Sequence, residues 1–180
     1  MTRADELPDS GRYERDALVR PLAEEEERSL AGPPKRVCCW RYTENEKSFP
    51  GWNLAADPAA CVELVAQLED LLRATEPSSV TRALEAPTPD VLAVPNNLGG
   101  GAALVAVQEL RVAFVPSSPP DRWRLEPSAR CLGVSAGSAA LRELIEQLED
   151  VRDGDGDCWM GSGEDELWFW WTPRVRVSRG

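Results

Sequence analysis

Two segments of the chain repeat apolar residues at the spacing of an amphipathic helix. In both, these residues recur at intervals of three and four: Cys61, Leu64, Val65, Leu68 and Leu72 in the first segment, and Leu141, Leu144, Ile145 and Leu148 in the second. This periodicity predicts two helices that each bury one face. Asp57 followed by Pro58 is a typical start signal for the first helix, with Asp57 as the N-cap acceptor. Glu76-Pro77 and Gly154 predict where the two helices end.

The two helical segments belong to a longer internal repeat with an offset of 80 residues. Residues 54–70 align with residues 134–150, and nine of the 17 aligned positions are identical. The identical pairs are Ala56/Ala136, Ala59/Ala139, Ala60/Ala140, Glu63/Glu143, Leu64/Leu144, Gln67/Gln147, Leu68/Leu148, Glu69/Glu149 and Asp70/Asp150. Because the match includes polar positions and the segment that enters each helix, it predicts a duplicated unit rather than two helices of similar composition.

Short runs rich in β-branched and aromatic residues surround each helix. They occupy residues 36–43, 51–55, 91–95, 103–108, 110–115, 122–125, 130–134, 157–160 and 166–172. The predicted order of elements is therefore strand–strand–helix–strand–strand. It occurs twice, over about residues 36–108 and 110–172. Short connections containing Gly, Pro and Asn favour antiparallel pairing. We predict an α+β fold, in which the duplicated β-β-α-β-β unit forms a mostly antiparallel sheet with two helices on one face.

Residues 1–34 differ from the rest of the chain. They are rich in acidic residues and arginine, contain few large apolar residues and end in Gly32-Pro33-Pro34. Such a segment cannot bury enough apolar surface to offset the entropy cost of ordering. We expect a flexible acidic N-terminal arm over 1–34, followed by a single α+β domain over 35–180.

The last predicted strand is apolar on both of its faces. In Leu167–Trp171 alternate residues point to opposite sides, so Leu167, Phe169 and Trp171 share one face, while Trp168 and Trp170 share the other. Two helices on one side of a sheet do not cover the second face. The cover is the N-terminal arm, a second sheet layer, a twin subunit or another partner, unless the strand lies centrally in a thick core. Since tryptophans are frequent at binding hot spots, Trp168, Trp170 and Trp159 are the candidate partner-binding residues.

Composition and charge exclude several classes of function. A net charge of −11 argues against binding to nucleic acid, which needs clustered cations, and no apolar run is long enough to span a membrane. The absence of His excludes a Ser-His-Asp triad and imidazole metal ligands. Five scattered cysteines without a C-x-x-C pair indicate reduced, packed thiols. The first residues lack the apolar stretch of a secretory signal, so we expect a cytoplasmic protein.

An acidic run after the second helix is the candidate metal site. Asp153, Asp155, Asp157 and Glu164 fall at positions 1, 3, 5 and 12 of a calcium-binding loop. Position 6 is Cys158, where that loop requires Gly, and no helix is predicted to follow. Two interpretations stay open: a calcium site, with no other cofactor expected, or a solvated acidic turn between helix and strand.

No catalytic residues are predicted. General acid–base catalysis by carboxylates needs two of them in one pocket, whereas Glu63 and Glu143 lie at equivalent rather than facing positions of the repeat. The glycine-rich segment 95–101 lacks the lysine of a phosphate-binding loop, and a strand rather than a helix is predicted after it. The chain is therefore more typical of a binding protein than of an enzyme.

One segment of the chain resembles a known kind of protein. The sequence ALRELIEQLEDVRDGDGDCWMGSGEDELWFWW, residues 140–171, is a helix followed by a Gly-Asp turn and a tryptophan-rich strand. It is similar in style to small acidic bacterial proteins such as the immunity proteins of polymorphic toxin systems. The resemblance implies stoichiometric neutralisation of a protein partner through an acidic surface. It carries over no functional residue.

These observations favour a non-catalytic protein-binding module, with an immunity-type inhibitor as its specific form. Its partner would be another protein or a second copy of this chain, and neither nucleic acid nor a membrane is expected. Two alternatives remain: a divalent-metal-binding domain built on the Asp153 to Glu164 acidic loop, and a homo-oligomeric structural protein whose tryptophan strand pairs with its own copy.

Overall fold

Both helices form where the apolar periodicity places them. The computed structural model describes residues 35–43, 50–95 and 102–173, and the arm predicted over 1–34 lies outside these ranges. Helix α2 (Pro58–Leu72) and helix α4 (Ser138–Asp153) start 80 residues apart and pack against each other. As predicted, α4 ends at Gly154, whose φ of 96° is the left-handed conformation that glycine adopts without strain. Helix α2 ends before the predicted Glu76-Pro77.

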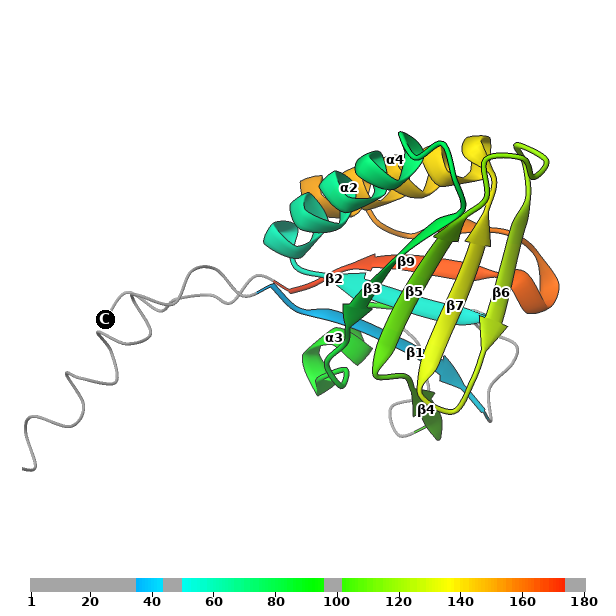
Figure 1. Cartoon of the computed structure of the whole chain (residues 1–180). Helices are drawn as coiled ribbons and strands as arrows, with labels where there is room; N and C mark the ends of the chain where they lie inside the picture. The colour runs from blue at the N-terminus through cyan, green and yellow to red at the C-terminus, as the bar shows by residue number, and fades with distance from the viewer. Residues whose placement is uncertain (1–34, 44–49, 96–101, 174–180) are drawn as a thin grey trace, which may run out of the picture. The chain divides into compact units, whose positions relative to one another are not determined.

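The strands form two separate sheets. Sheet A has the order β4-β1-β2-β9-β8, and sheet B has the order β3-β5-β7-β6. The strands of sheet A are β1 (Val37–Tyr42), β2 (Trp52–Ala56), β4 (Leu104–Ala106), β8 (Cys158–Met160) and β9 (Leu167–Trp171). Those of sheet B are β3 (Ser78–Ala83), β5 (Glu109–Phe114), β6 (Trp123–Pro127) and β7 (Cys131–Ala136). Figure 1 shows the strands of the two sheets crossing each other.

Most neighbouring strands are antiparallel, and the α+β class is confirmed, but the single predicted sheet is wrong. The hairpin β1–β2 lies in sheet A, and after α2 the chain enters sheet B. The hairpin β6–β7 lies in sheet B, and after α4 the chain returns to sheet A as β8–β9. Each helix thus carries the chain from one sheet to the other. The parallel pair β2–β9 joins the two halves, and the parallel pair β5–β7 lies within the second half. The duplication of the sequence unit stays a prediction.

The main core lies between the facing sides of the two sheets and beneath the two helices, which run across one end of both sheets (Figure 1). Its fully buried large side chains include Leu54, Leu68, Leu132, Leu141, Leu148, Leu167 and Phe169. Leu68, Leu141 and Leu148 come from the predicted apolar faces of the helices, and Leu167 and Phe169 share one predicted face of the last strand. The helices therefore close the wedge between the sheets rather than covering one flat sheet.

Two elements differ from the sequence prediction. The strand expected over 91–95 is wrong, because a short helix, α3 (Pro89–Ala93), forms there. Thr88 caps this helix, accepting a hydrogen bond from the Val91 N–H at 3.4 Å, and Pro89 occupies the first turn. Strand β3 was not predicted, since its sequence SSVTRA is largely polar and exposed. Its pairing with β5 over six residue pairs makes it an edge strand of sheet B.

Candidate functional site

The outer face of sheet A carries a row of aromatic side chains. Strand pairing places Trp40 opposite Asn53, Asn53 opposite Trp168, and Trp168 opposite Trp159. Because paired residues on neighbouring strands point to the same side, these four side chains form one row across β1, β2, β9 and β8. The sequence prediction of an apolar second face on the Trp strand therefore holds beyond that strand.

Trp159 and Trp168 form the exposed end of this row, and we call the pair the tryptophan surface. Their ring centroids are 5.0 Å apart with an interplanar angle of 32°. Trp159 lies on the edge strand β8 and is 55% exposed, whereas Trp168 is partly buried. The Trp168 indole N–H donates to a Glu166 carboxylate oxygen at 2.5 Å and to the Pro50 carbonyl at 3.0 Å. These contacts fix the ring that supports Trp159.

Trp170, the third residue predicted to bind a partner, is buried. It is 2% exposed and stacks on Trp168 with ring centroids 6.0 Å apart. Its indole N–H donates to the Asn53 side-chain oxygen at 3.0 Å, and Asn53 is itself fully buried. Trp170 therefore supports the tryptophan surface and does not present its own ring to a partner.

Helix α3 supplies part of the cover that the sequence required for the outer face. A second apolar cluster joins residues of β1, β2, β9 and α3: Cys38, Trp40, Tyr42, Ala55, Val91 and Trp170. Val91 is 3% exposed within it, and Leu92 and Val94 pack against its edge. The cover over β1 thus comes from the chain itself, and exposure increases toward β8, where Trp159 lies.

Acidic residues flank the tryptophan surface. Asp157 immediately precedes β8, adopts a φ of 75°, and donates its backbone N–H to the Phe169 carbonyl at 3.1 Å. Asp155 and Asp157 are both exposed, and Glu166 is held against Trp168. In a chain with a net charge of −11, these residues place negative charge against Trp168 and within four residues of Trp159 in the sequence. Such a surface attracts cationic groups, through both charge and the faces of the rings.

The structure does not assemble the predicted calcium site. Asp153 pairs with its neighbour Arg152 at 2.9 and 3.1 Å, and this guanidinium lowers the pKa of the Asp153 carboxyl. Strand β8 follows Asp157, and Glu164 lies beyond it in a 3-10 helix over Gly163–Asp165. Within the described residues, no group of three or more Cys, Asp or Glu side chains could hold a metal ion.

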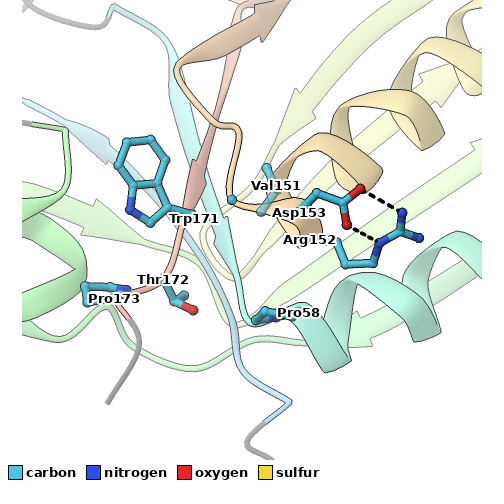
Figure 2. A pocket seen from close by; sticks show the side chains of 8 residues that line it. Pro58, Val151, Arg152, Asp153, Trp171, Thr172 and Pro173 are labelled. Carbon is cyan, nitrogen blue, oxygen red and sulfur yellow. Dashed lines mark hydrogen bonds and ion pairs between the residues drawn. The ribbon is translucent and has the colours of Figure 1, made fainter. Parts of the chain in front are cut away.

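A pocket of about 360 Å³ lies where α2 begins and α4 ends (Figure 2). It is lined by Pro58, Val151, Arg152, Asp153, Gly154, Trp171, Thr172 and Pro173. Figure 2 shows the Asp153 carboxylate turned to the Arg152 guanidinium. The Thr172 hydroxyl donates to the carboxylate of Asp57. Among the described residues, the Arg152, Asp153 and Thr172 side chains of this pocket are thus each engaged with another protein side chain.

Three of the five cysteines are packed thiols, as predicted, and Cys131 and Cys158 are partly exposed. All five are free, and Cys38, Cys39 and Cys61 are buried. Burial raises the pKa of Cys38 and Cys158 from 9.0 to about 11, raises that of Cys61 to about 12, and raises that of Cys39 as well. The thiolate is the nucleophilic form, so these four side chains are poor nucleophiles at neutral pH.

The raised pKa of Cys158 predicts the order in which the partly exposed cysteines are alkylated. Cys158 and Cys131 are both partly exposed, but the rise of two units in the Cys158 pKa depletes its thiolate about 100-fold at pH 8. We expect iodoacetamide to label Cys131 first in the native protein, with Cys158 reacting about tenfold faster for each pH unit up to its pKa. Peptide mass spectrometry over a time course measures this, and labelling in 8 M urea, where all five react, is the control. Equal native rates for Cys158 and Cys131 would contradict the prediction.

Sequence reasoning singled out the tryptophans but not the groups that accept their indole N–H bonds: Glu166 and Pro50 for Trp168, and Asn53 for Trp170. Asn53 gave a usable signal, since it is a polar residue at an otherwise apolar strand position in WNLAA. Glu166 lies two residues before Trp168, whereas the contact with Pro50 joins segments 118 residues apart. Among the described residues, no helix is long and apolar enough to cross a membrane. No protein-family model, curated protein or solved structure matches this chain.

Proposed function

We propose that this protein is a non-catalytic protein-binding module that engages its partner through the tryptophan surface. The observation that carries the proposal is the 55% exposure of Trp159 on a ring held in place by Trp168. A large, rigid aromatic side chain contributes much contact area at a low entropy cost, and Trp is enriched among interface hot spots. The other large apolar side chains exposed to this degree in the described residues are Val62 and Val105, which are smaller and carry no stacked neighbour.

The acidic flank favours a basic partner. Asp155, Asp157 and Glu166 add negative charge around the aromatic contact, and the whole chain carries −11. Complementary charge accelerates association and selects among partners more than it deepens affinity. A basic toxin domain neutralised by stoichiometric binding, the immunity-type activity implied by the resemblance of residues 140–171, fits this combination.

The test is the variant Trp159→Ala. We expect it to weaken binding of the partner by about 30-fold or more, because truncating a hot-spot tryptophan costs about 2 kcal/mol or more. Partners retained from a lysate by the wild-type protein are identified and purified, and their dissociation constants for both proteins are measured by calorimetry. The matched control is Val62→Ala, which removes a side chain of 54% exposure from α2 and should leave binding unchanged.

Two results would contradict the proposal. In one, a purified partner binds Trp159→Ala and the wild-type protein equally well. In the other, light scattering shows a stable dimer in which Trp159 emission is protected from a soluble quencher, and Trp159→Ala dissociates it. That second result favours the homo-oligomeric alternative, for which the specific observation is that β8 is an edge strand of sheet A.

A further inference from the structure

Arg41 occupies an unusual position in sheet A. In β1 its side chain points to the same side as those of Val37 and Cys39, which belong to the main core. Strand pairing places Arg41 opposite Val105 of β4. On the other side of β1, Trp40 pairs with Asn53, so the next residue, Arg41, lies opposite Trp52 of β2. The other residues of sheet A on this inner side are apolar: Val37, Cys39, Trp52, Leu54, Ala56, Val105, Cys158, Met160, Leu167, Phe169 and Trp171.

A pocket of about 340 Å³ opens at Arg41. It is lined by Arg41, Tyr42, Thr43, Trp52, Val105 and Ser128. Trp52 begins β2, whose opposite end leads into α2, so this pocket lies at the end of β2 opposite the start of α2. Ser128 follows β6 of sheet B, so both sheets contribute to the wall. The volume is at the lower end of the range for sites that take small organic ligands, roughly 300–1,000 Å³.

Three hydroxyl-bearing residues line the pocket, and Tyr42 belongs to the apolar cluster on the outer face of sheet A. The other two, Thr43 and Ser128, have already committed their hydrogens. Thr43 Oγ1 donates to the Ala103 carbonyl at 3.1 Å. Ser128 Oγ donates to the Cys131 carbonyl at 3.0 Å and accepts the Cys131 N–H at 3.1 Å. Neither side chain therefore needs a ligand to satisfy its hydrogen bonding.

The groups that remain unsatisfied are donors. Arg41 makes no hydrogen bond or ion pair with the part of the chain that the structure describes, although its guanidinium carries five N–H groups. Trp52 is 4% exposed, and its indole N–H is buried without an acceptor in the same described ranges. An unpaired buried donor costs free energy that an acceptor oxygen would recover. The complement to this pocket is therefore a group that only accepts.

We propose that this pocket binds a small organic carboxylate, with its carboxylate on the Arg41 guanidinium and the Trp52 indole N–H, and its apolar body against the Trp52 ring and Val105. The planar guanidinium fork matches a carboxylate in a bidentate arrangement. Trp52 and Val105 give the pocket apolar walls, which suit a carbon skeleton better than a fully charged inorganic anion. The net charge of −11 repels free anions from most of the surface. An anion would therefore be held only where donors such as the Arg41 guanidinium outweigh that repulsion. The site is independent of the tryptophan surface and of the function proposed for it.

The probe is benzoate, with the neutral isostere benzamide and inorganic phosphate as comparisons. Binding is measured by calorimetry and by the indole N–H signal of Trp52 in ¹⁵N-labelled protein, assigned with Trp52→Phe. We expect benzoate to bind and shift the Trp52 signal, and benzamide to bind at least about tenfold more weakly, because it lacks the charge-assisted hydrogen bonds. Phosphate should bind more weakly than benzoate.

Variants assign the roles of the two residues. Arg41→Gln should weaken benzoate binding by about tenfold or more. Arg41→Lys keeps the charge but loses the guanidinium fork, so its affinity for benzoate should lie between those of the wild-type protein and Arg41→Gln. Trp52→Phe keeps the apolar wall and should weaken binding a few-fold. The control Arg111→Gln removes an equal charge from an exposed position on sheet B and should change nothing.

Three outcomes would overturn the proposal. The first is equal binding of benzoate and benzamide. The second is unchanged benzoate affinity in Arg41→Gln, which would show that the Arg41 guanidinium does not hold the carboxylate. The third is tighter binding of phosphate than of benzoate, which would replace the organic carboxylate with an inorganic oxyanion. Urea unfolding of each variant shows that a loss of binding does not reflect a loss of fold.

Discussion

Replacing Trp170 with alanine is expected to destabilise the protein by about 3–5 kcal/mol, the usual cost of removing a fully buried tryptophan. Trp170 is 2% exposed and belongs to the apolar cluster on the outer face of sheet A. The substitution also leaves the Asn53 side-chain oxygen without its donor. Because the Asn53 NH₂ group already lacks a partner among the described residues, the buried amide would then be unsatisfied at both ends. Urea unfolding followed by circular dichroism measures the loss.

The matched comparison is Trp159→Ala, which removes the same kind of side chain from the neighbouring strand β8 on the same face. Since Trp159 is 55% exposed, its loss should change the free energy of unfolding by less than about 1 kcal/mol. Trp170→Phe should fall between, because it keeps much of the buried area but not the hydrogen bond to Asn53. Equal destabilisation by the two alanine variants would show that Trp159 is a core residue and would remove the main support for the proposed binding surface.

The contrast between these tryptophans marks the limit of sequence reasoning on this strand. Alternation in Leu167–Trp171 correctly assigns each side chain to a face, because the side-chain period of a strand is two. It does not say what lies over that face. Cover over β1 comes from α3, and the sequence of α3, PDVLA, is as apolar as a short strand. Only its cap at Thr88 and its first-turn proline distinguish it, and these signals are easily overlooked in five residues.

The arrangement in two sheets could not be read from the hydrophobic pattern either. Periodicity identified the helices, most strands and their buried faces, but it does not specify which strands become neighbours. Trp52 pairs with Leu167 in the parallel pair β2–β9, and Leu110 pairs with Leu132 in β5–β7. The first pair joins strands from different predicted units, whereas β5 and β7 both belong to the second unit and are parallel rather than antiparallel. Long-range partners of this kind are chosen by how the two helices pack, which no local window contains.

The acidic loop shows the same limit for a candidate site. Counting positions placed Asp153, Asp155, Asp157 and Glu164 at calcium-binding spacing, but that spacing only works if the intervening chain curls around the ion. Here Cys158–Met160 is an extended strand paired with β9. A strand advances about 3.3 Å per residue, so it carries Glu164 away from the aspartates. The mismatch at position 6, Cys158 in place of Gly, was the signal in the sequence.

Asp57 is a residue whose local role was only partly predicted. The sequence indicated an N-cap acceptor, and Asp57 does occupy that position with φ −70° and ψ 150°. Its side chain makes no capping hydrogen bond. One carboxylate oxygen instead accepts from the backbone N–H and the Nε–H of Arg36, both at 3.1 Å, and the other accepts from the Thr172 hydroxyl. Hydrogen bonding to Asp57 raises the pKa of Arg36.

Asp57→Ala is therefore expected to cost about 3 kcal/mol of unfolding free energy, beyond the roughly 1 kcal/mol typical of a lost helix cap. Asp57 is 4% exposed and joins the segment before β1, the start of α2 and the residue that follows β9. Removing it strands the Arg36 N–H and guanidinium and the Thr172 hydroxyl at one buried junction. Asp57→Asn, which keeps the shape but not the charge, should cost less.

A double-mutant cycle with Thr172→Val separates this role from simple capping. If Asp57 links the two ends of the domain, the variants should couple by about 0.5–3 kcal/mol, as residues in one hydrogen-bond network do. If Asp57 acted only as a cap, its effect and that of Thr172→Val would add, because Thr172 is far from α2 in sequence and touches it through this carboxylate. Urea unfolding of the four proteins measures the coupling. Additive effects, with a loss near 1 kcal/mol for Asp57→Ala, would show that the junction contributes no more than an ordinary N-cap.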